Sequence, residues 1–328
     1  MPSKINNNNN NNLLRKIDIS NYMVYIIFAL TMLIFVIWLG GTFFTVTNIL
    51  NITRQTAMVS VMAVAMTFVI ASGNIDLSIG STVALTALVS ALVLQNTGNI
   101  ILAALAGFSI GIVIGFINGF LITKVGIPSF LATLGMGGVV KGTAMWVTGT
   151  AAVPVTNSTF VSLFGMGNLF GIIPTLLIWT IVIMLIGHYV LHNTGFGKKV
   201  LAVGGNAISA RYTGIKNDRV TTKVLILSSM SAVLAGLLYS GRMQAARYTF
   251  GEGDELTVIA AVILGGTSMA GGKGSVIGAV VGSLLMGMIN NGLIIGGLNV
   301  SQQVIIRGAI IILAVGVGTV AARHTKRK

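Results

Sequence analysis

Ten apolar stretches, most of them near 20 residues long, limit what this chain can fold into. They cover roughly residues 23–44, 56–72, 79–95, 99–123, 129–149, 170–191, 222–243, 255–270, 275–296 and 302–321. Only 8% of the 328 residues are charged, where a soluble protein would carry about 25%. The stretches lack the strict alternation of barrel strands and have the length of membrane-crossing helices. The sequence therefore predicts an all-α, polytopic membrane protein with about ten transmembrane helices.

The lysines and arginines indicate on which side of the membrane each loop lies. With a cytoplasmic N-terminus, fifteen of them fall in inner segments and three (Arg54, Arg242 and Arg247) in outer segments, while Lys141 and Arg307 lie within spans. This distribution satisfies the positive-inside rule, and the inverted orientation violates it. Both termini are therefore predicted to be cytoplasmic. Topology also explains the net charge of +14, so no nucleic-acid partner is expected.

We expect a single transmembrane domain over residues 23–321. Residues 1–22 contain an asparagine run at residues 6–12 and are predicted to form a disordered cytoplasmic segment. Residues 322–328 are predicted to form a basic cytoplasmic tail. The chain has no cysteine, which excludes disulfides, a thiol nucleophile and a cysteine metal site.

Two short interruptions separate apolar stretches: "SGNIDLS" (residues 72–78) and "AGGKGS" (residues 270–275). The sequences around them are alike, which hints at an internal repeat of the kind that many transporters contain. Each interruption is either a surface loop or a break within the membrane. Together they supply the residues of a predicted structural or gate motif, namely Gly73, Asp76, Ser78, Gly80, Gly272 and Gly274.

Asp76 is the only acidic residue between Asp18 and Asp218. An unpaired carboxylate in a membrane is costly, so we expect Asp76 or Ser78 to cap the helix that begins near residues 77–79. The alternative is direct contact with a transported solute, or an ion pair near a gate.

Glycines recur every four residues in two of the predicted spans. They are Gly107, Gly111, Gly115 and Gly119 in one span, and Gly274, Gly278 and Gly282 in another. Small residues at this spacing let helices approach closely. We expect packing within one bundle, with a subunit interface as the alternative.

The longest cytoplasmic loop, residues 192–223, contains a short predicted helix. Asn206 is suited to cap its start and Gly214 to end it. A capped helix on the cytoplasmic face is suited to be held by a partner; the alternative is an ordinary positively charged loop that anchors the topology.

Three motifs in this chain resemble those of one family. The stretch "GFGKKVLAVGGNAISARYTGI" resembles the cytoplasmic coupling loop of ABC importer permeases of the ribose, xylose and arabinose type. The stretches "ASGNIDLSIGS" and "VIAAVILGGTSMAGGKGSVIGAVVGSLLMGMINNGL" resemble two further motifs of that family. The resemblance covers roughly residues 45–320. It implies that Gly205, Asn206, Ala210, Arg211 and Gly214 lie in the coupling helix.

The resemblance also implies a function and partners. The chain would be the permease subunit of an importer for a monosaccharide, with a ribose-like pentose favoured. It would pair with a second copy or a related permease, with an ABC ATPase subunit and with an extracytoplasmic sugar-binding protein, and membrane lipid would surround it. The chain contains no G-x-x-x-x-G-K-[ST] motif, so it is not expected to be an enzyme or to hold a cofactor. ATP and magnesium would be bound by the partner ATPase.

Uncharged polar residues in the spans are candidates for the translocation path, chiefly Asn118, Asn290 and Asn291. Bonds between helices explain them equally well. The outer segment from residue 240 to residue 256 concentrates charge, and Arg242 and Arg247 are candidates for docking the binding protein.

Three other patterns in the sequence point to different chemistry. "GEGD" at residues 251–254 matches a pattern of intramembrane aspartyl proteases, but that chemistry needs a second carboxylate from a Tyr-Asp pair, which the chain lacks. His188 and His192 share a helical face without a nearby carboxylate, so no metal site is expected. An ion-coupled secondary transporter of a small polar solute, with Asp76 as its carboxylate, is the alternative function.

Overall fold

The structure, a computed structural model, describes residues 23–326 and is built almost entirely of helices. The long helices are α1 (Met23–Leu39), α2 (Val46–Ala71), α3 (Ile79–Thr97), α4 (Ile100–Phe120), α5 (Ser129–Thr148), α7 (Thr175–Asn193), α10 (Asn217–Met243), α12 (Val276–Ile295) and α13 (Val300–Lys326). The short helices and helical turns are η2 (Gly40–Thr42), η3 (Leu121–Val125), α6 (Ser158–Val161), η4 (Ser162–Met166), α8 (Gly195–Gly205), α9 (Ala207–Tyr212) and α11 (Asp254–Leu264). Strand β1 (Val153–Pro154) pairs with β4 (Ala245–Ala246), and β2 (Asn168–Leu169) pairs with β3 (Ile173–Pro174), both antiparallel.

Eight of the described helices are long and apolar enough to cross a membrane, and they match the first seven predicted spans and the ninth. In the tenth, Val300–Leu313 is a shorter apolar helix. The predicted span at 255–270 is different, because α11 has only 11 residues and about 20 are needed to cross. The predicted class, an all-α polytopic membrane protein, is confirmed, with one span reduced to a half-length helix.

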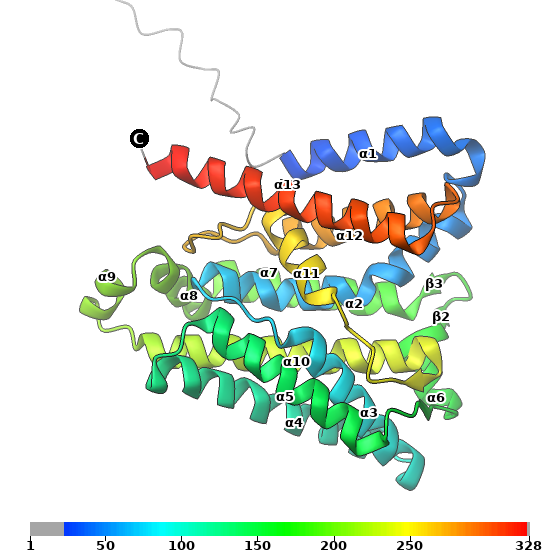
Figure 1. Cartoon of the computed structure of the whole chain (residues 1–328), viewed down its shortest axis with the longest axis horizontal. Coiled ribbons are helices and arrows are strands. Elements are labelled where there is room, and N and C mark those ends of the chain that lie inside the picture. The colour runs from blue at the N-terminus through cyan, green and yellow to red at the C-terminus, as the bar shows by residue number, and fades with distance from the viewer. Residues whose placement is uncertain (1–22, 327–328) are drawn as a thin grey trace, which may run out of the picture.

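The predicted ends of the chain are only partly described. Residues 1–22, the predicted asparagine-rich segment, lie outside the described residues, as do residues 327 and 328. Helix α13 continues through residue 326, so most of the predicted basic tail is helical. Helix α1 runs away from the end of the molecule that carries α8 and α9, and α13 runs back towards it (Figure 1).

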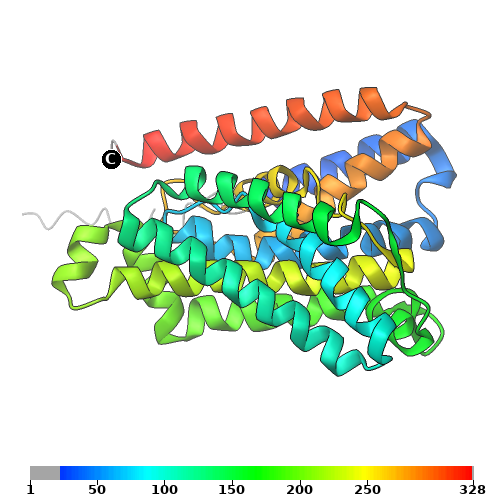
Figure 2. The same ribbon diagram turned by 60° about the horizontal axis from the view of Figure 1, so that its bottom comes forward.

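The helices pack around two central members, α2 and α10, which are the most buried spans. Helix α10 packs against α2, α3 and α4, while α2 also contacts α7, α11 and α12. Figure 2 shows α13 lying along the outside of the bundle. Helices α8 and α9 project at one end, and α6 and the β2–β3 pair lie at the other (Figure 1).

The glycine ridge of α4 explains how closely it approaches α10. A side chain at Gly111 would meet Val233, and one at Gly115 would meet the backbone of Ile226. On α12, Gly278 and Gly282 likewise face α11. Both ridges therefore pack within the bundle, as expected, and the alternative of a subunit interface is wrong for these glycines.

Candidate functional site

The first interruption, residues 72–78, is a buried break rather than a surface loop. Helix α2 ends at Ala71, and Gly73 turns the chain with a positive φ of 82°. Asp76 and Ser78 are both fully buried at 0% exposure. Buried backbone outside a helix must find other hydrogen-bond partners, and the break depends on its neighbours for them.

Helix α5 supplies those partners through two side chains. The Ile75 N–H donates to Ser129 Oγ at 3.2 Å, and the Leu77 N–H donates to Thr133 Oγ1 at 3.0 Å. The Thr133 hydroxyl in turn donates to the Ile75 carbonyl at 3.3 Å. Two hydroxyls one turn apart on α5 therefore hold the break in its extended form.

Asp76 joins the break to α10. Its Oδ1 accepts from the Ser78 N–H at 2.9 Å and from Ser78 Oγ at 2.6 Å, and its Oδ2 accepts from Ser228 Oγ at 2.7 Å. Asn118 Nδ2 of α4 donates to Ser78 Oγ at 2.9 Å. Asp76 thus satisfies the N–H of the residue before α3, while the expected cap by Ser78 is absent because that side chain is committed to Asp76 and Asn118.

A second break, residues 244–253, was not expected from the sequence, which predicted an outer loop there. After β4 pairs with β1, the segment turns through Gly251 and Gly253, whose φ values are 73° and 79°, and α11 begins at Asp254. Gly251 packs against Gly80 at the start of α3. A Cβ at Gly251 and a Cβ at Gly236 of α10 would both meet Val83 of α3, and Gly236 lies seven residues, or about 10 Å, before the last residue of α10. The segment therefore turns back from the end of α10 into the bundle.

The two breaks cross where α3 and α11 begin. Neither Gly80 nor Gly251 has room for a Cβ, because each would collide with the carbonyl oxygen of the other. The first turn of α11 carries Asp254 and Glu255, and Asp254 Oδ2 accepts from Tyr239 Oη at 2.6 Å. Helix N-termini carry partial positive charge. The N-termini of α3 and α11, with the carboxylates of Asp254 and Glu255 nearby, therefore form a polar site inside an apolar bundle.

A cavity of about 290 Å³ lies beside this crossing. Its polar lining comes from Ser81, Lys141, Glu252 and Glu255, with the rings of Tyr248 and Phe250 and the residues Leu77, Leu134, Gly137 and Gly138 around them. Lys141 Nζ of α5 pairs with Glu252 Oε1 at 2.7 Å. The cavity offers donors, acceptors and aromatic faces to a small polar molecule.

The end of the bundle that carries α8 and α9 holds a contact made mainly of backbone. The Gly272 N–H donates to the Ala71 carbonyl at 2.9 Å. A Cβ at Gly204 would collide with that same carbonyl oxygen, and a Cβ at Gly272 would lie 2.8 Å from Gly205 Cα. The end of α8 therefore presses on the end of α2 and on the loop before α12.

The predicted gate glycines divide between two places. Gly73 and Gly272 lie at the backbone contact beside the end of α8, and Gly274 packs against Ala71 in the same region. Gly80 lies instead at the crossing of the two breaks. The structure thus brings predicted coupling residue Gly205 to the first group and leaves Gly80 apart from it.

Helix α9 has both of its expected end signals. Asn206 Oδ1 accepts from the Ser209 N–H at 2.9 Å, which is an N-cap. Gly214 takes a positive φ of 84°, and its N–H donates to the Arg211 carbonyl at 3.0 Å. Among the predicted coupling residues Ala210 is buried, so it anchors α9 inward.

The outward face of α9 is unusually exposed. Tyr212 is 88% and Ile208 is 72% exposed, and Arg211 between them is exposed as well. Large apolar side chains gathered on such a surface indicate a site of contact. Sequence reasoning missed Ile208 and Tyr212, although their spacing of four on a capped helix was a usable signal.

A family model described as "Branched-chain amino acid transport system / permease component" matches residues 48–315, which include both breaks and the α8–α9 loop. The chain belongs to this permease family.

Curated relatives of the permease carry more particular names. The ribose import permease protein RbsC of Escherichia coli K12 is 38% identical over 281 residues, covering 84% of this chain and 87% of the relative. RbsC of Bacillus subtilis is 38% identical over 278 residues, covering 84% and 86%. The L-arabinose ABC transporter permease protein AraH of Azospirillum brasilense is 35% identical over 274 residues, covering 83% and 80%. No solved structure matches.

These matches confirm the resemblance to ABC importer permeases of the ribose, xylose and arabinose type. Together with the apolar helices they make the permease a multi-pass protein of the bacterial plasma membrane. The family is a transport component rather than a catalytic one.

The predicted path residues of the permease do not gather at one place. Asn118 belongs to the Asp76 network. Asn290 on α12 accepts from Arg307 Nη2 at 3.0 Å, and the neighbouring Asn291 is buried. Asn290 therefore joins α12 to α13, Asn291 Oδ1 has no hydrogen-bond partner among the described residues, and of the three only Asn118 bonds to a break.

The outer charges of the permease also separate. Glu252 pairs with Lys141, and Asp254 binds Tyr239, so these carboxylates face the cavity and the crossing. Arg247 is exposed, and Arg242 is half-buried at the end of α10. The two arginines remain the candidates for docking at this end of the permease.

Sequence reasoning missed the cavity residues Lys141, Glu252 and Glu255. One signal was present, because a lysine inside a predicted span is by default a functional candidate. Its partner Glu252 lies 111 positions away. Nothing local in the sequence pairs residues so distant.

Proposed function

We propose that this chain is the membrane-spanning subunit of an ATP-driven ABC importer that moves a monosaccharide into the cell, with a ribose-like pentose as the first candidate. The names of the relatives, which include ribose and arabinose permeases, support the substrate class. The family match supports a transport role.

The observation that carries this proposal is the contact between α8 and the first break. Gly204 and Gly205 touch Ala71 and Gly272 through backbone, so a displacement of α8 reaches the start of the break at residues 72–78 directly. The exposed α9 follows α8 without a gap other than Asn206. A partner that moves α9 therefore acts on the segments that cross beside the cavity.

The cavity beside the crossing suits a sugar. Its volume of about 290 Å³ is small, and it presents Lys141, Glu252 and Glu255 next to the rings of Tyr248 and Phe250. Charged side chains form strong hydrogen bonds with hydroxyls, and ring faces pack on the apolar face of a sugar. A neutral, hydroxyl-rich solute fits this lining better than an ion does.

The proposed partners are an ABC ATPase subunit on α9, a second copy or a related permease within the membrane, and an extracytoplasmic sugar-binding protein at the opposite end. The ATPase subunit would bind ATP and magnesium, since the chain has no phosphate-binding G-x-x-x-x-G-K-[ST] motif. On this proposal the chain itself carries out no hydrolysis.

Reconstitution tests the proposal. The permease is placed in proteoliposomes with a candidate ABC ATPase and a candidate sugar-binding protein from the same organism, and uptake of radiolabelled ribose, xylose and arabinose is measured with Mg-ATP on the cytoplasmic face. We expect uptake that requires all three proteins and ATP. Uptake by the permease alone, driven by a proton or sodium gradient, would show a secondary transporter instead.

A further inference from the structure

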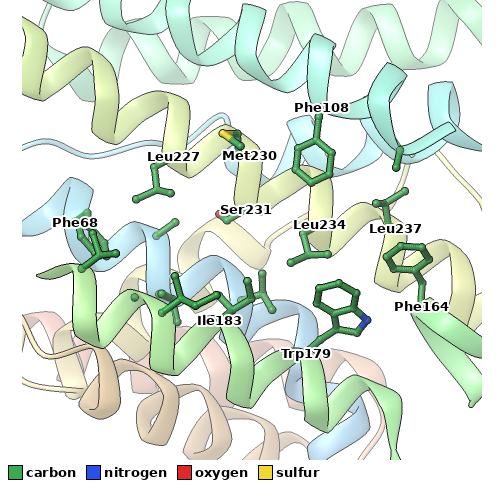
Figure 3. A pocket seen from close by; sticks show the side chains of 17 residues that line it. Phe68, Phe108, Phe164, Trp179, Ile183, Leu227, Met230, Ser231, Leu234 and Leu237 are labelled. Atoms are coloured by element: carbon green, nitrogen blue, oxygen red, sulfur yellow. The ribbon is translucent and has the colours of Figure 1, made fainter. Parts of the chain in front are cut away.

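A long apolar cavity of about 380 Å³ lies between α2, α4, α7 and α10, away from the crossing of the breaks. Figure 3 shows its side chains, with Phe68 at one end, Phe164 and Trp179 at the other, and Met230 and Phe108 between them. Phe164 of η4 joins the side chains of these four helices, and α10 forms the floor of the cavity from Leu227 to Leu237.

The cavity presents no free polar group among its lining residues. Ser231 Oγ donates to the Ser228 carbonyl at 2.7 Å within α10, and Trp179 Nε1 donates to the Leu163 carbonyl at 3.0 Å. Apolar cavities without polar partners do not hold ordered water. The wall therefore offers a ligand only hydrocarbon contact.

The cavity borders helix faces that meet lipid. On α4, Ile112 and Phe116 are exposed, and on α7, Leu185 and Ile186 are exposed, all as apolar side chains. Along α10 the floor from Leu227 to Leu237 spans ten residues, about 15 Å, which is half of the roughly 30 Å hydrocarbon core of a bilayer. The dimensions fit an extended acyl chain.

A second cavity of about 450 Å³ lies at the cytoplasmic end, where α8 faces the start of α10. Four cations line it: Lys199, Lys216, Arg219 and Lys223. All four side chains are exposed. Both ion pairs within residues 23–326 involve other lysines, Lys124 and Lys141, so these four cations have no carboxylate partner there.

The two cavities adjoin each other. Phe68 of the apolar cavity stacks on Phe196 of the cationic one, with ring centroids 6.3 Å apart. On α10, Lys223 and Leu227 are four residues apart and so lie on one face, one turn above the other. A ligand with an anionic head and an apolar tail can occupy both cavities at once.

We propose that this composite cavity binds one anionic phospholipid of the cytoplasmic leaflet, with an acyl chain along α10 and its phosphate among the four cations. Each cation near an anionic headgroup favours it over a neutral one, and basic pockets at the cytoplasmic ends of transmembrane helices bind such headgroups. A zwitterionic lipid gains the apolar contact but little from the cations. The lipid would hold α8 to α10, and α8 ends at the Gly204–Gly205 contact with the first break.

Trp179 gives a direct test. The chain has three tryptophans, and replacing two of them, Trp38→Phe and Trp146→Phe, leaves Trp179 at the far end of the apolar cavity as the single emitter. The full-length protein is reconstituted in phosphatidylcholine vesicles with a fixed fraction of either phosphatidylglycerol or phosphatidylcholine brominated near the chain end. We expect the brominated phosphatidylglycerol to quench Trp179 fluorescence several-fold more effectively.

Matched variants distinguish binding of the lipid headgroup from binding of the acyl chain. Lys199→Gln with Lys223→Gln should lower the preference for phosphatidylglycerol by about fivefold per cation. Lys198→Gln with Lys273→Gln removes the same charge outside the cavity and should leave the preference unchanged. Ala104→Phe fills the apolar cavity and should reduce quenching by both lipids, whereas Ile112→Phe on the exposed face of α4 should not.

Two results would overturn the proposal. One is equal quenching by the two brominated lipids in the parent protein. The other is an unchanged preference in the Lys199→Gln, Lys223→Gln variant together with weaker ATPase binding, which would assign these cations to the ATPase. Thermal unfolding of every variant shows that it is folded before its quenching is compared.

Discussion

Asp76 is a carboxylate whose partners are all uncharged donors. Ser78 donates twice to Oδ1 and Ser228 donates once to Oδ2, with no cation among these bonds. An ionised group buried this way relies on its hydrogen bonds to offset the loss of water. A neutral side chain that accepts the same hydrogen bonds can therefore replace the Asp76 carboxylate.

Asp76→Asn should keep much of the transport activity. Its Oδ1 can still accept from Ser78, and Ser228 can rotate its hydroxyl to accept from the new amide. Asp76→Ala should lower the free energy of unfolding by about 1–3 kcal/mol, because the buried donors lose their acceptor. Thermal unfolding in detergent with sugar uptake measures both. Equal failure of Asn and Ala would mean that the charge itself is required.

Gly80 tests the crossing of the breaks at the level of one atom. Gly80→Ala should disrupt the start of α3, because its Cβ would collide with the Gly251 carbonyl oxygen. We expect loss of uptake and a lower unfolding temperature. Gly142→Ala on α5 is the control, since a Cβ there meets nothing within 4 Å. A Gly80→Ala protein that behaves like the control would show that the two segments separate freely.

At the scale of the element, α9 is a six-residue helix with a cap at each end and an exposed face. Its caps follow from local chemistry, and the sequence predicted them from Asn206 and Gly214. The packing of the preceding helix α8 against α2 and the loop before α12, through Gly204 and Gly205, is long-range and was not predicted. Local patterns fix where a helix begins and ends, whereas contacts between distant glycines leave no periodic signal.

Arg211→Glu should abolish ATPase activity that depends on transport while leaving insertion intact. The charge reversal alters an exposed side chain of α9, flanked by Ile208 and Tyr212, without touching a buried group. Stimulated ATPase activity and membrane yield measure the two effects. Lys198→Glu makes the same charge change on α8. Full stimulation in the Arg211 variant would place the coupling surface elsewhere.

The breaks show a second limit on prediction. Residues 72–78 interrupt two apolar runs, so the first break was visible as an interruption. The second, at 244–253, is polar and follows a span, and hydropathy assigns such a segment to the water-facing side. The position of this segment inside the bundle depends on the contact between Gly80 and Gly251, two residues that are adjacent only in the folded chain.

At the scale of the whole molecule, hydropathy predicted the helical class, because the bilayer imposes internally paired backbone on any chain that crosses it. The orientation, which the distribution of lysine and arginine indicates, stays a prediction. The sequence did not predict how far apart the candidate path residues lie in the fold. Asn118 is on α4, whereas Asn290 and Asn291 are on α12. The two ends of the molecule also differ in charge, which bears on how partners approach.

Arg242→Glu with Arg247→Glu should slow delivery of sugar by the binding protein, most strongly at low salt. Exposed charges steer encounter, and they are screened over about 8 Å at physiological ionic strength. ATPase activity stimulated by the binding protein, measured over a salt series in the reconstituted complex, gives the effect. Arg54→Glu, at another outer arginine, is the control. Stimulation equal to wild type at every salt concentration would exclude this docking surface.

The contact of Gly204 and Gly205 with Ala71 and Gly272 has a mechanical consequence. Side chains between two moving parts act as springs, because rotamers can change and absorb a displacement. At this contact main chain meets main chain, so there is little compliance to absorb one. A displacement of α9 would therefore be transmitted with little loss to the end of α2 and to the loop that follows α11. The two breaks, which are connected to these segments, would move together.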